Sequence, residues 1–166
     1  LRQVDRKIYE GKFYSKDTTR LENSRILEIL LNNGFALAAS ESPEVLKYET
    51  NVSSLENKVN LTLTFITGEA YNFGKTMISF RGEKYNITTN DVTRELTYKE
   101  GELYSKEKII KSEINLSKMS ILENPRITFS KVDSVNHIID LSLDIVVSNK
   151  YELTPEIFSY YFQNYF

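Results

Sequence analysis

The chain has 166 residues, of which 40% are hydrophobic and 12% aromatic, and it contains only three prolines. This composition supports a buried core and excludes disorder over most of the length. The charges of the 21 basic and 23 acidic residues nearly cancel, and the two kinds are interspersed. The sequence therefore has no concentration of positive charge that would bind nucleic acid. The absence of cysteine excludes disulfides, thiolate metal sites and a thiol nucleophile.

Nothing at the start of the chain resembles a targeting segment. It opens Leu1-Arg2-Gln3, without an initiator methionine or the apolar region of a signal peptide. No apolar run reaches the roughly 18 residues of a membrane helix. We interpret the sequence as a fragment of a longer protein.

A seven-residue pattern occurs twice. Residues 11–17 read GKFYSKD and residues 101–107, ninety positions later, read GELYSKE, which share G-x-[FL]-Y-S-K-[DE]. Each copy is followed by a helix-like stretch and then by two strand-like stretches. The repeated order predicts two similar units.

In the first unit a helix is predicted near residues 17–33, because apolar residues recur on one broad face and Asn33-Gly34 favours a left-handed cap. That face comprises Leu21, Ile26, Leu27, Ile29, Leu30 and Leu31. Residues 44–52 predict a strand of mixed polarity. The alternation over residues 59–65 predicts a strand with one buried face. Residues 1–10 match an opening strand poorly, so we expect that strand to be frayed or to lie upstream.

The second unit has a clearer opening strand, at residues 73–81, followed by a short helix near residues 89–96. A second helix begins at Ser105, and its apolar residues, Ile109, Ile110, Ile114 and Met119, lie mainly on one side. Asn124-Pro125 is expected to end this helix. Two strands follow, at residues 126–132 and 139–147, joined by a turn, and the second has the strongest alternation in the chain.

The predicted fold class is therefore α+β. It consists of two tandem β-α-α-β-β domains, each a three-stranded mixed sheet covered on one face by two helices. We expect the first domain over residues 1–72, with a first strand that is either frayed or upstream of the sequence, and the second over residues 73–150. Residues 151–166 form an aromatic tail, which either leads into a membrane-facing strand or folds back onto the domain.

Three stretches resemble POTRA (polypeptide-transport-associated) domains. Residues 11–35 are similar to the family's helix pair leading to a glycine–aromatic pair, here Gly34-Phe35. Residues 68–82 resemble the junction between consecutive POTRA domains. Residues 101–121 resemble the start of the second helix and its end, although Ser120-Ile121 replaces the usual Gly-Phe. The spacing best resembles BamA- and TamA-like outer-membrane assembly factors.

The resemblance implies a location and partners. It implies a segment on the periplasmic side of the bacterial outer membrane, next to a β-barrel that is absent from this sequence. The implied partners are unfolded outer-membrane proteins or subunits of the assembly machinery. POTRA domains of two-partner-secretion or cell-division proteins are the alternative within the family.

The residue inventory does not favour an enzyme, a metal site or a cofactor. His137 is the only histidine, which excludes a multi-histidine metal site, and we interpret it as a solvated residue beside a turn. Asp140 and Asp144 share one side of a strand, where a solvated sheet face explains them better than a catalytic pair. Neither phosphate-binding glycine motif occurs.

The candidate site is the middle strand of each unit, which we expect at a sheet edge. Unpaired backbone groups at such an edge can accept an extended chain by β-augmentation, with little dependence on sequence. The candidate residues are Leu46, Lys47, Tyr48, Glu49 and Thr50 in the first unit and Ile127, Thr128, Phe129, Ser130 and Lys131 in the second. Two alternatives remain open, an edge protected by its charged residues and a rigid spacer between a barrel and another complex.

Overall fold

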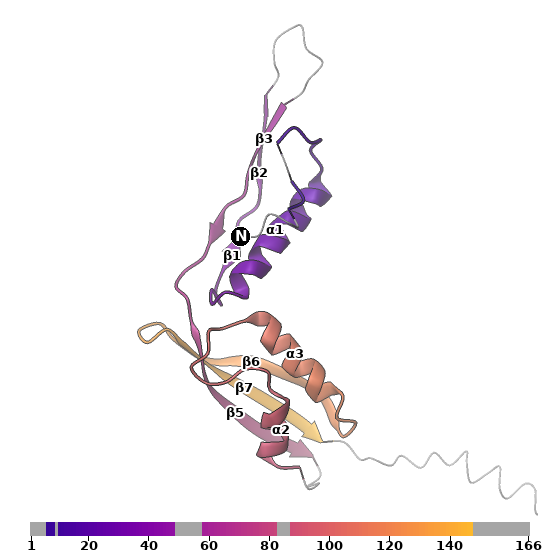
Figure 1. The fold of residues 1–166 in the computed structure, drawn as a ribbon, viewed down its shortest axis with the longest axis vertical. Coiled ribbons are helices and arrows are strands. Elements are labelled where there is room, and N and C mark those ends of the chain that lie inside the picture. The colour runs from indigo at the N-terminus through magenta and orange to yellow at the C-terminus, as the bar shows by residue number, and fades with distance from the viewer. Residues whose placement is uncertain (1–5, 9, 49–57, 83–86, 148–166) are drawn as a thin grey trace, which may run out of the picture.

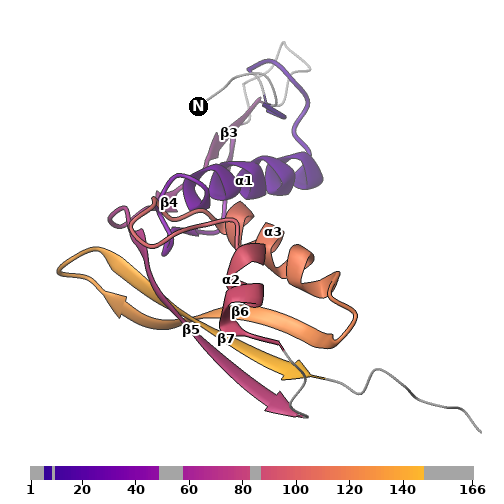
Figure 2. The ribbon, with the colours of Figure 1, turned by 60° about the horizontal axis from the view of Figure 1, so that its bottom comes forward.

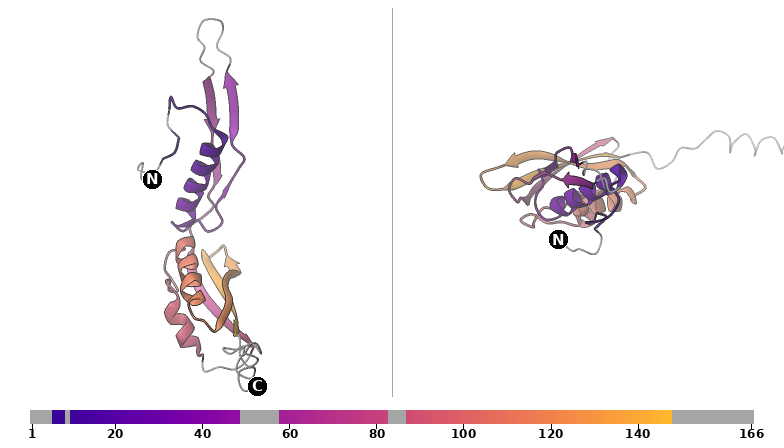
Figure 3. Two further views of the ribbon diagram at one scale, coloured as in Figure 1. Left: turned by 90° about the vertical axis from the view of Figure 1, so that its right-hand side faces the viewer. Right: turned by 90° about the horizontal axis from the view of Figure 1, so that it is seen from above.

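The computed structural model describes residues 6–8, 10–48, 58–82 and 87–147, which form two α+β units. The units follow one another along the long axis of the molecule (Figures 1 and 3). The first contains α1 (Lys16–Leu31), β1 (Ala39–Ser40), β2 (Glu44–Tyr48), β3 (Lys58–Thr62) and β4 (Phe65–Ile66). The second contains β5 (Asn72–Gly82), α2 (Thr89–Glu95), α3 (Lys106–Ser117), β6 (Leu122–Asp133) and β7 (Ile138–Val147). The predicted aromatic tail lies outside the described residues.

The second unit has the predicted β-α-α-β-β order. Its three strands form one sheet in the order β5-β7-β6, with β5 and β7 parallel and β6 and β7 antiparallel. The C-terminal strand is thus the central one, and β5 and β6 lie at the edges. Helices α2 and α3 cover one face of the sheet (Figure 2).

Strand β7 explains why the sheet has a covered face and an open one. Ile139, Leu141, Leu143 and Ile145 are fully buried, whereas the residues between them are exposed or half-buried. Because side chains alternate across a strand, these four face the helices and place the core on that side. The predicted alternation and its buried face are confirmed.

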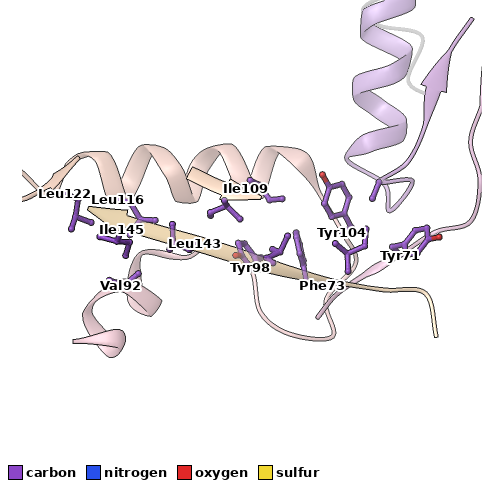
Figure 4. Packing of buried hydrophobic residues seen from close by; sticks show 14 of the residues in the cluster. Tyr71, Phe73, Val92, Tyr98, Tyr104, Ile109, Leu116, Leu122, Leu143 and Ile145 are labelled. Atoms are coloured by element: carbon purple, nitrogen blue, oxygen red, sulfur yellow. The ribbon is translucent and has the colours of Figure 1, made fainter. Parts of the chain in front are cut away.

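An aromatic cluster closes the core at the end nearest the first unit. Phe73 of β5 is 1% exposed and stacks on Tyr98 with ring centroids 4.3 Å apart. Tyr104, from the second copy of the repeat, lies 5.3 Å from Phe73 (Figure 4). Burial of the Tyr104 hydroxyl raises its pKa to about 12.

The first unit is less complete in the described residues. Its strands form two antiparallel pairs, β1 with β4 and β2 with β3, and α1 lies beside them (Figure 1). The described part of this unit contains one helix and no opening strand. Within the described ranges, the complete three-stranded sheet with two helices is present in the second unit only.

The buried face of α1 differs from the predicted one. Thr19 and Glu22 are buried, whereas Leu21 is 60% exposed. Glu22 can be buried because Arg25 donates two hydrogen bonds to its carboxylate, at 3.0 and 2.7 Å, and the Lys7 amide donates a third at 2.8 Å. A buried charge that is paired in this way no longer requires solvent. The prediction from the sequence used hydrophobicity alone, so it did not identify the face of α1 that contains Thr19 and Glu22.

The hydrogen bonds from Arg25 lower the pKa of Glu22 and outweigh the effect of burial, so the first unit should lose stability in acid. The stabilisation is complete above the unfolded value of about 4.3 and is lost as pH falls through the lower folded pKa. We expect Glu22→Gln to flatten this acid dependence in urea unfolding followed between pH 6 and 3. The exposed Glu41→Gln is the control, and parallel profiles for wild type and Glu22→Gln would disprove the assignment.

Candidate peptide-binding edge

Strand β6 lies at an edge of the sheet, because it pairs with β7 and with no other described strand. This is the strand that holds the second set of candidate residues, 127–131. Its neighbour β7 pairs on both sides, so β7 has no free edge. An incoming chain can add to this part of the molecule only beside β6 or, on the far side, beside β5.

One hydrogen bond shows which backbone groups of β6 point outward. The Ile127 amide donates to the Glu113 carboxylate of α3 at 2.8 Å, so it points away from its partner Leu143 in β7. Along an antiparallel ladder, residues that face the partner alternate with residues that face away. Phe129 and Val132 are opposite Leu141 and Ile139, in the same phase of β7 as Leu143, so their amides also point outward.

Two irregularities interrupt the edge. The register shifts between Glu123 and Arg126, where Asn124 has a φ of +42° and Pro125 lacks an amide hydrogen. It shifts again between Phe129 and Lys131, which leaves Ser130 without a register partner. Bulges and proline are devices that limit strand addition at an edge. The outward amides of Ile127 and Phe129 therefore lie on one side of the bulge at Ser130, and that of Val132 lies on the other.

A groove of about 300 Å³ separates α3 from the start of β6. Ile110, Glu113, Ile114, Ser117, Asn124, Pro125 and Arg126 line it. Ile110 and Ile114 are 44% and 52% exposed, although the helical pattern placed them with the core. Ile109, Ser112 and Leu116 fill the core side of α3 instead. The sequence analysis did not single out Glu113, because its contact with Ile127 joins two elements 14 positions apart.

The first-unit candidates are only partly described. In β2, Leu46, Lys47 and Tyr48 pair with Asn60, Val59 and Lys58 of β3. Glu49 and Thr50 lie outside the described residues. Strand β2 has a strand on one side only among the described residues, so it is also an edge.

The acidic residues on the open sheet face have structural partners. Asp140 accepts a hydrogen bond from the Lys75 amide at 2.8 Å, at a register shift in β5. Asp144 accepts a hydrogen bond from the Ser79 hydroxyl and lies 3.8 Å from Arg81. Both carboxylates therefore stabilise the β5–β7 pairing, in agreement with the surface interpretation.

His137 differs from the sequence-based interpretation. It lies beside the turn as predicted, with a φ of +53°, but its ring packs edge-on against Tyr71, with centroids 5.8 Å apart. It is thus a packed residue at the junction of the units. In the described residues no three side chains are placed to share a metal ion. The helices of that part of the chain are too short or too polar to cross a bilayer.

The two units are joined by hydrogen bonds as well as by the chain. Gly34 donates to the Tyr104 carbonyl at 3.0 Å, Tyr71 donates to the Gly34 carbonyl at 2.8 Å, and Tyr104 donates to the Tyr71 carbonyl at 2.9 Å. Gly34 has a φ of +94°, and an added Cβ would lie 2.7 Å from Leu103 Cδ1. The positive φ favours glycine at this contact between the two units.

Asn32 caps a helix that belongs to the other unit. Its Oδ1 accepts a hydrogen bond from the Glu107 amide at 2.8 Å, in the first turn of α3. The Ser105 hydroxyl also donates to this oxygen, at 3.3 Å, and Ser105 itself makes no capping bond. In the first copy of the repeat, Ser15 caps α1 directly. In the second copy the cap of α3 is therefore supplied by Asn32 of the first unit and not by Ser105.

We expect Asn32→Ala to destabilise α3 by about 1 kcal/mol, the usual effect of losing an N-cap. Because the cap crosses the junction, residual dipolar couplings should also show looser orientation of the two units. Asn33→Ala is a matched control, since the Asn33 side chain bonds within the first unit, to the Ile29 carbonyl. Equal effects of the two substitutions would contradict a role for Asn32 at the junction.

Comparisons with known proteins identify the fold. No family model matches the sequence, and no curated protein matches it. Among solved structures, BamA from Haemophilus ducreyi lacking POTRA domains 1–3 matches with a TM-score of 0.62 and 18% identity, over 85% of this chain and 25% of that chain. Haemophilus influenzae BamA POTRA3–5 matches with a TM-score of 0.61 and 16% identity, over 86% of this chain and 55% of that chain.

These similarities define the class of fold. The chain has the fold of POTRA domains as they occur in BamA, which confirms the resemblance inferred from the sequence. It spans a quarter of one of these chains and about half of the other.

Proposed function

We propose that this chain is a polypeptide-binding module of a BamA-like outer-membrane protein assembly factor, facing the periplasm. It binds extended segments of unfolded outer-membrane proteins, or of assembly-machinery subunits, by adding them as a strand beside β6. It acts without catalysis. In this proposal residues 1–72 and 73–150 are two POTRA domains, and the second carries the principal site.

The outward-facing amides of Phe129 and Val132 carry this proposal. No side chain in the described part of the molecule accepts a hydrogen bond from either amide, and the side chains of both residues are about 40% exposed, at 41% and 37%. Backbone pairing gives affinity that depends little on side-chain sequence, which suits a receptor for many different chains. The turn end of β6 extends past α3 (Figure 2), and residues 128–132 are exposed.

The groove should favour a bound strand in which apolar and polar side chains alternate. Ile110 and Ile114 are one helical repeat apart, about 6 Å along α3, and alternate residues of a strand are about 6.6 Å apart. A strand beside β6 can therefore place two apolar side chains, two residues apart, against these isoleucines. Strands of membrane β-barrels alternate in this way.

A rigid spacer is the second candidate function. The Asn32 cap and the three backbone hydrogen bonds among Gly34, Tyr71 and Tyr104 favour it, because they fix one unit against the other. A spacer requires this junction but no accessible edge. The two functions are therefore separable by experiment.

The test is binding of a fluorescent peptide of about ten residues, the length of a membrane strand, that alternates leucine with threonine. Fluorescence anisotropy should show saturable binding of this peptide. A peptide of the same composition with leucines and threonines in blocks should bind several-fold more weakly. Absence of binding at millimolar protein would refute the proposed function and leave the spacer.

A further inference from the structure

The Glu113 carboxylate occupies a pairing position of the strand edge. Its Oε1 accepts the hydrogen bond that the Ile127 amide would otherwise give to the carbonyl of an added strand. Glu113 extends from α3, which covers the start of β6 but not its turn end (Figure 2). The outward amides of Phe129 and Val132 have no such internal acceptor among the described residues. The edge is thus divided into a closed half and an open half.

The closed half is held by a strong contact. At 2.8 Å the bond lies within the range of charge-assisted hydrogen bonds, which are roughly twice as strong as those between neutral groups. An incoming carbonyl is a neutral acceptor, so it replaces Glu113 only at a net loss. Pro125, next along the edge, offers no amide to compensate for that loss.

We propose that Glu113 gates the β6 edge and sets the register of the bound chain, an inference that rests on the proposed function. In the resting state an added strand pairs with Phe129 and Val132 and ends before Ile127. When the carboxylate leaves Ile127, pairing extends along the groove, and the apolar side chains of the added strand reach Ile110 and Ile114. The gate therefore separates a short, weak complex from a longer one that reads alternating apolar residues.

The test compares Glu113→Ala, Glu113→Gln and Glu107→Ala with wild type, using the alternating leucine–threonine peptide. Removing a competing hydrogen bond to a charged group should tighten binding about tenfold in Glu113→Ala. Glu113→Gln keeps a neutral acceptor and should give a smaller gain, about threefold. Glu107→Ala removes the same charge from the same helix, at a side chain that is 65% exposed and paired with Lys111, and should leave affinity unchanged.

Amide hydrogen exchange locates the effect. In wild type the Ile127 amide should be protected without peptide, and Glu113→Ala should remove that protection until peptide is added. Alanine favours helix, so α3 should remain folded, and Glu113→Gln provides the same comparison with less change in volume.

The outcomes distinguish the gate from the proposed function. Equal affinity of wild type and Glu113→Ala, with the peptide bound at β6 in both, would overturn the gate and leave the proposed function standing. Binding to none of the proteins, or binding away from β6, would overturn both. Tighter binding in Glu113→Ala together with peptide-dependent protection of Ile127 would establish the gate.

Discussion

Replacing Phe73 with alanine should lower the free energy of unfolding by about 3–5 kcal/mol, the largest stability effect that we expect in this chain. Phe73 is 1% exposed, and it stacks on Tyr98 and contacts Tyr104. The substitution leaves a cavity between the opening strand and the loop before α3. Urea unfolding monitored by circular dichroism measures the loss.

Phe13→Ala is the matched control for this prediction. Phe13 is at the third position of the first repeat copy and is fully exposed, so its truncation should change stability by less than about 0.5 kcal/mol. A loss below about 1 kcal/mol for Phe73→Ala would show that the aromatic cluster does not hold the second unit together.

Placing proline at Val132 should weaken binding of the alternating peptide about tenfold or more. Proline removes the outward amide and blocks close approach of an added strand, while an edge strand tolerates it in the fold. The loss of one hydrogen bond accounts for about 1 kcal/mol, and the lost approach adds to it. Fluorescence anisotropy measures the affinity.

Val132→Ala is the companion variant, because it shortens the side chain and retains the amide. It should bind peptide within about threefold of wild type. Circular dichroism must first show that Val132→Pro is folded. If alanine weakens binding as much as proline does, recognition depends on the valine side chain, and the proposal of backbone pairing at this position is wrong.

The sequence was most informative where one face of an element is buried and the other is not. Strand β7 was predicted at residues 139–147 and is observed at Ile138–Val147, because its apolar and polar residues alternate without a break. The opening strand β5, the helix α2 and the start of α3 were also placed within a few residues. The predicted apolar face of α3 was only partly right, because Ile109 is buried whereas Ile110 and Ile114 are exposed.

The prediction failed where polar residues or proline have structural roles within a helix or a strand. Glu22 is buried because Arg25 and the Lys7 amide satisfy its carboxylate, and no hydrophobic pattern reports such an arrangement. Asn124-Pro125 was expected to end a helix, yet it lies inside β6 as an irregularity of an edge strand. Proline is tolerated there because one side of the strand has no partner.

The sequence predicted that the candidate site is an edge strand, but it did not predict which backbone amides of that strand point outward. Residues 127–131 lie on an edge strand, as expected, but their outward amides depend on the phase of pairing with β7 and on a bulge at Ser130. Those features come from tertiary register. The contact between Glu113 and Ile127 joins residues 14 positions apart across two elements, so it could not be inferred from either element alone.

The central claim is that an extended chain pairs with the backbone of β6, and residue-resolved amide exchange tests it most directly. The exchange of Phe129 and Val132 should be measured in the wild-type chain, free and saturated with the alternating peptide. We predict that both amides are unprotected in the free protein and become protected by at least tenfold in the complex. Unchanged exchange at both residues, in a complex that is demonstrably saturated, would contradict it.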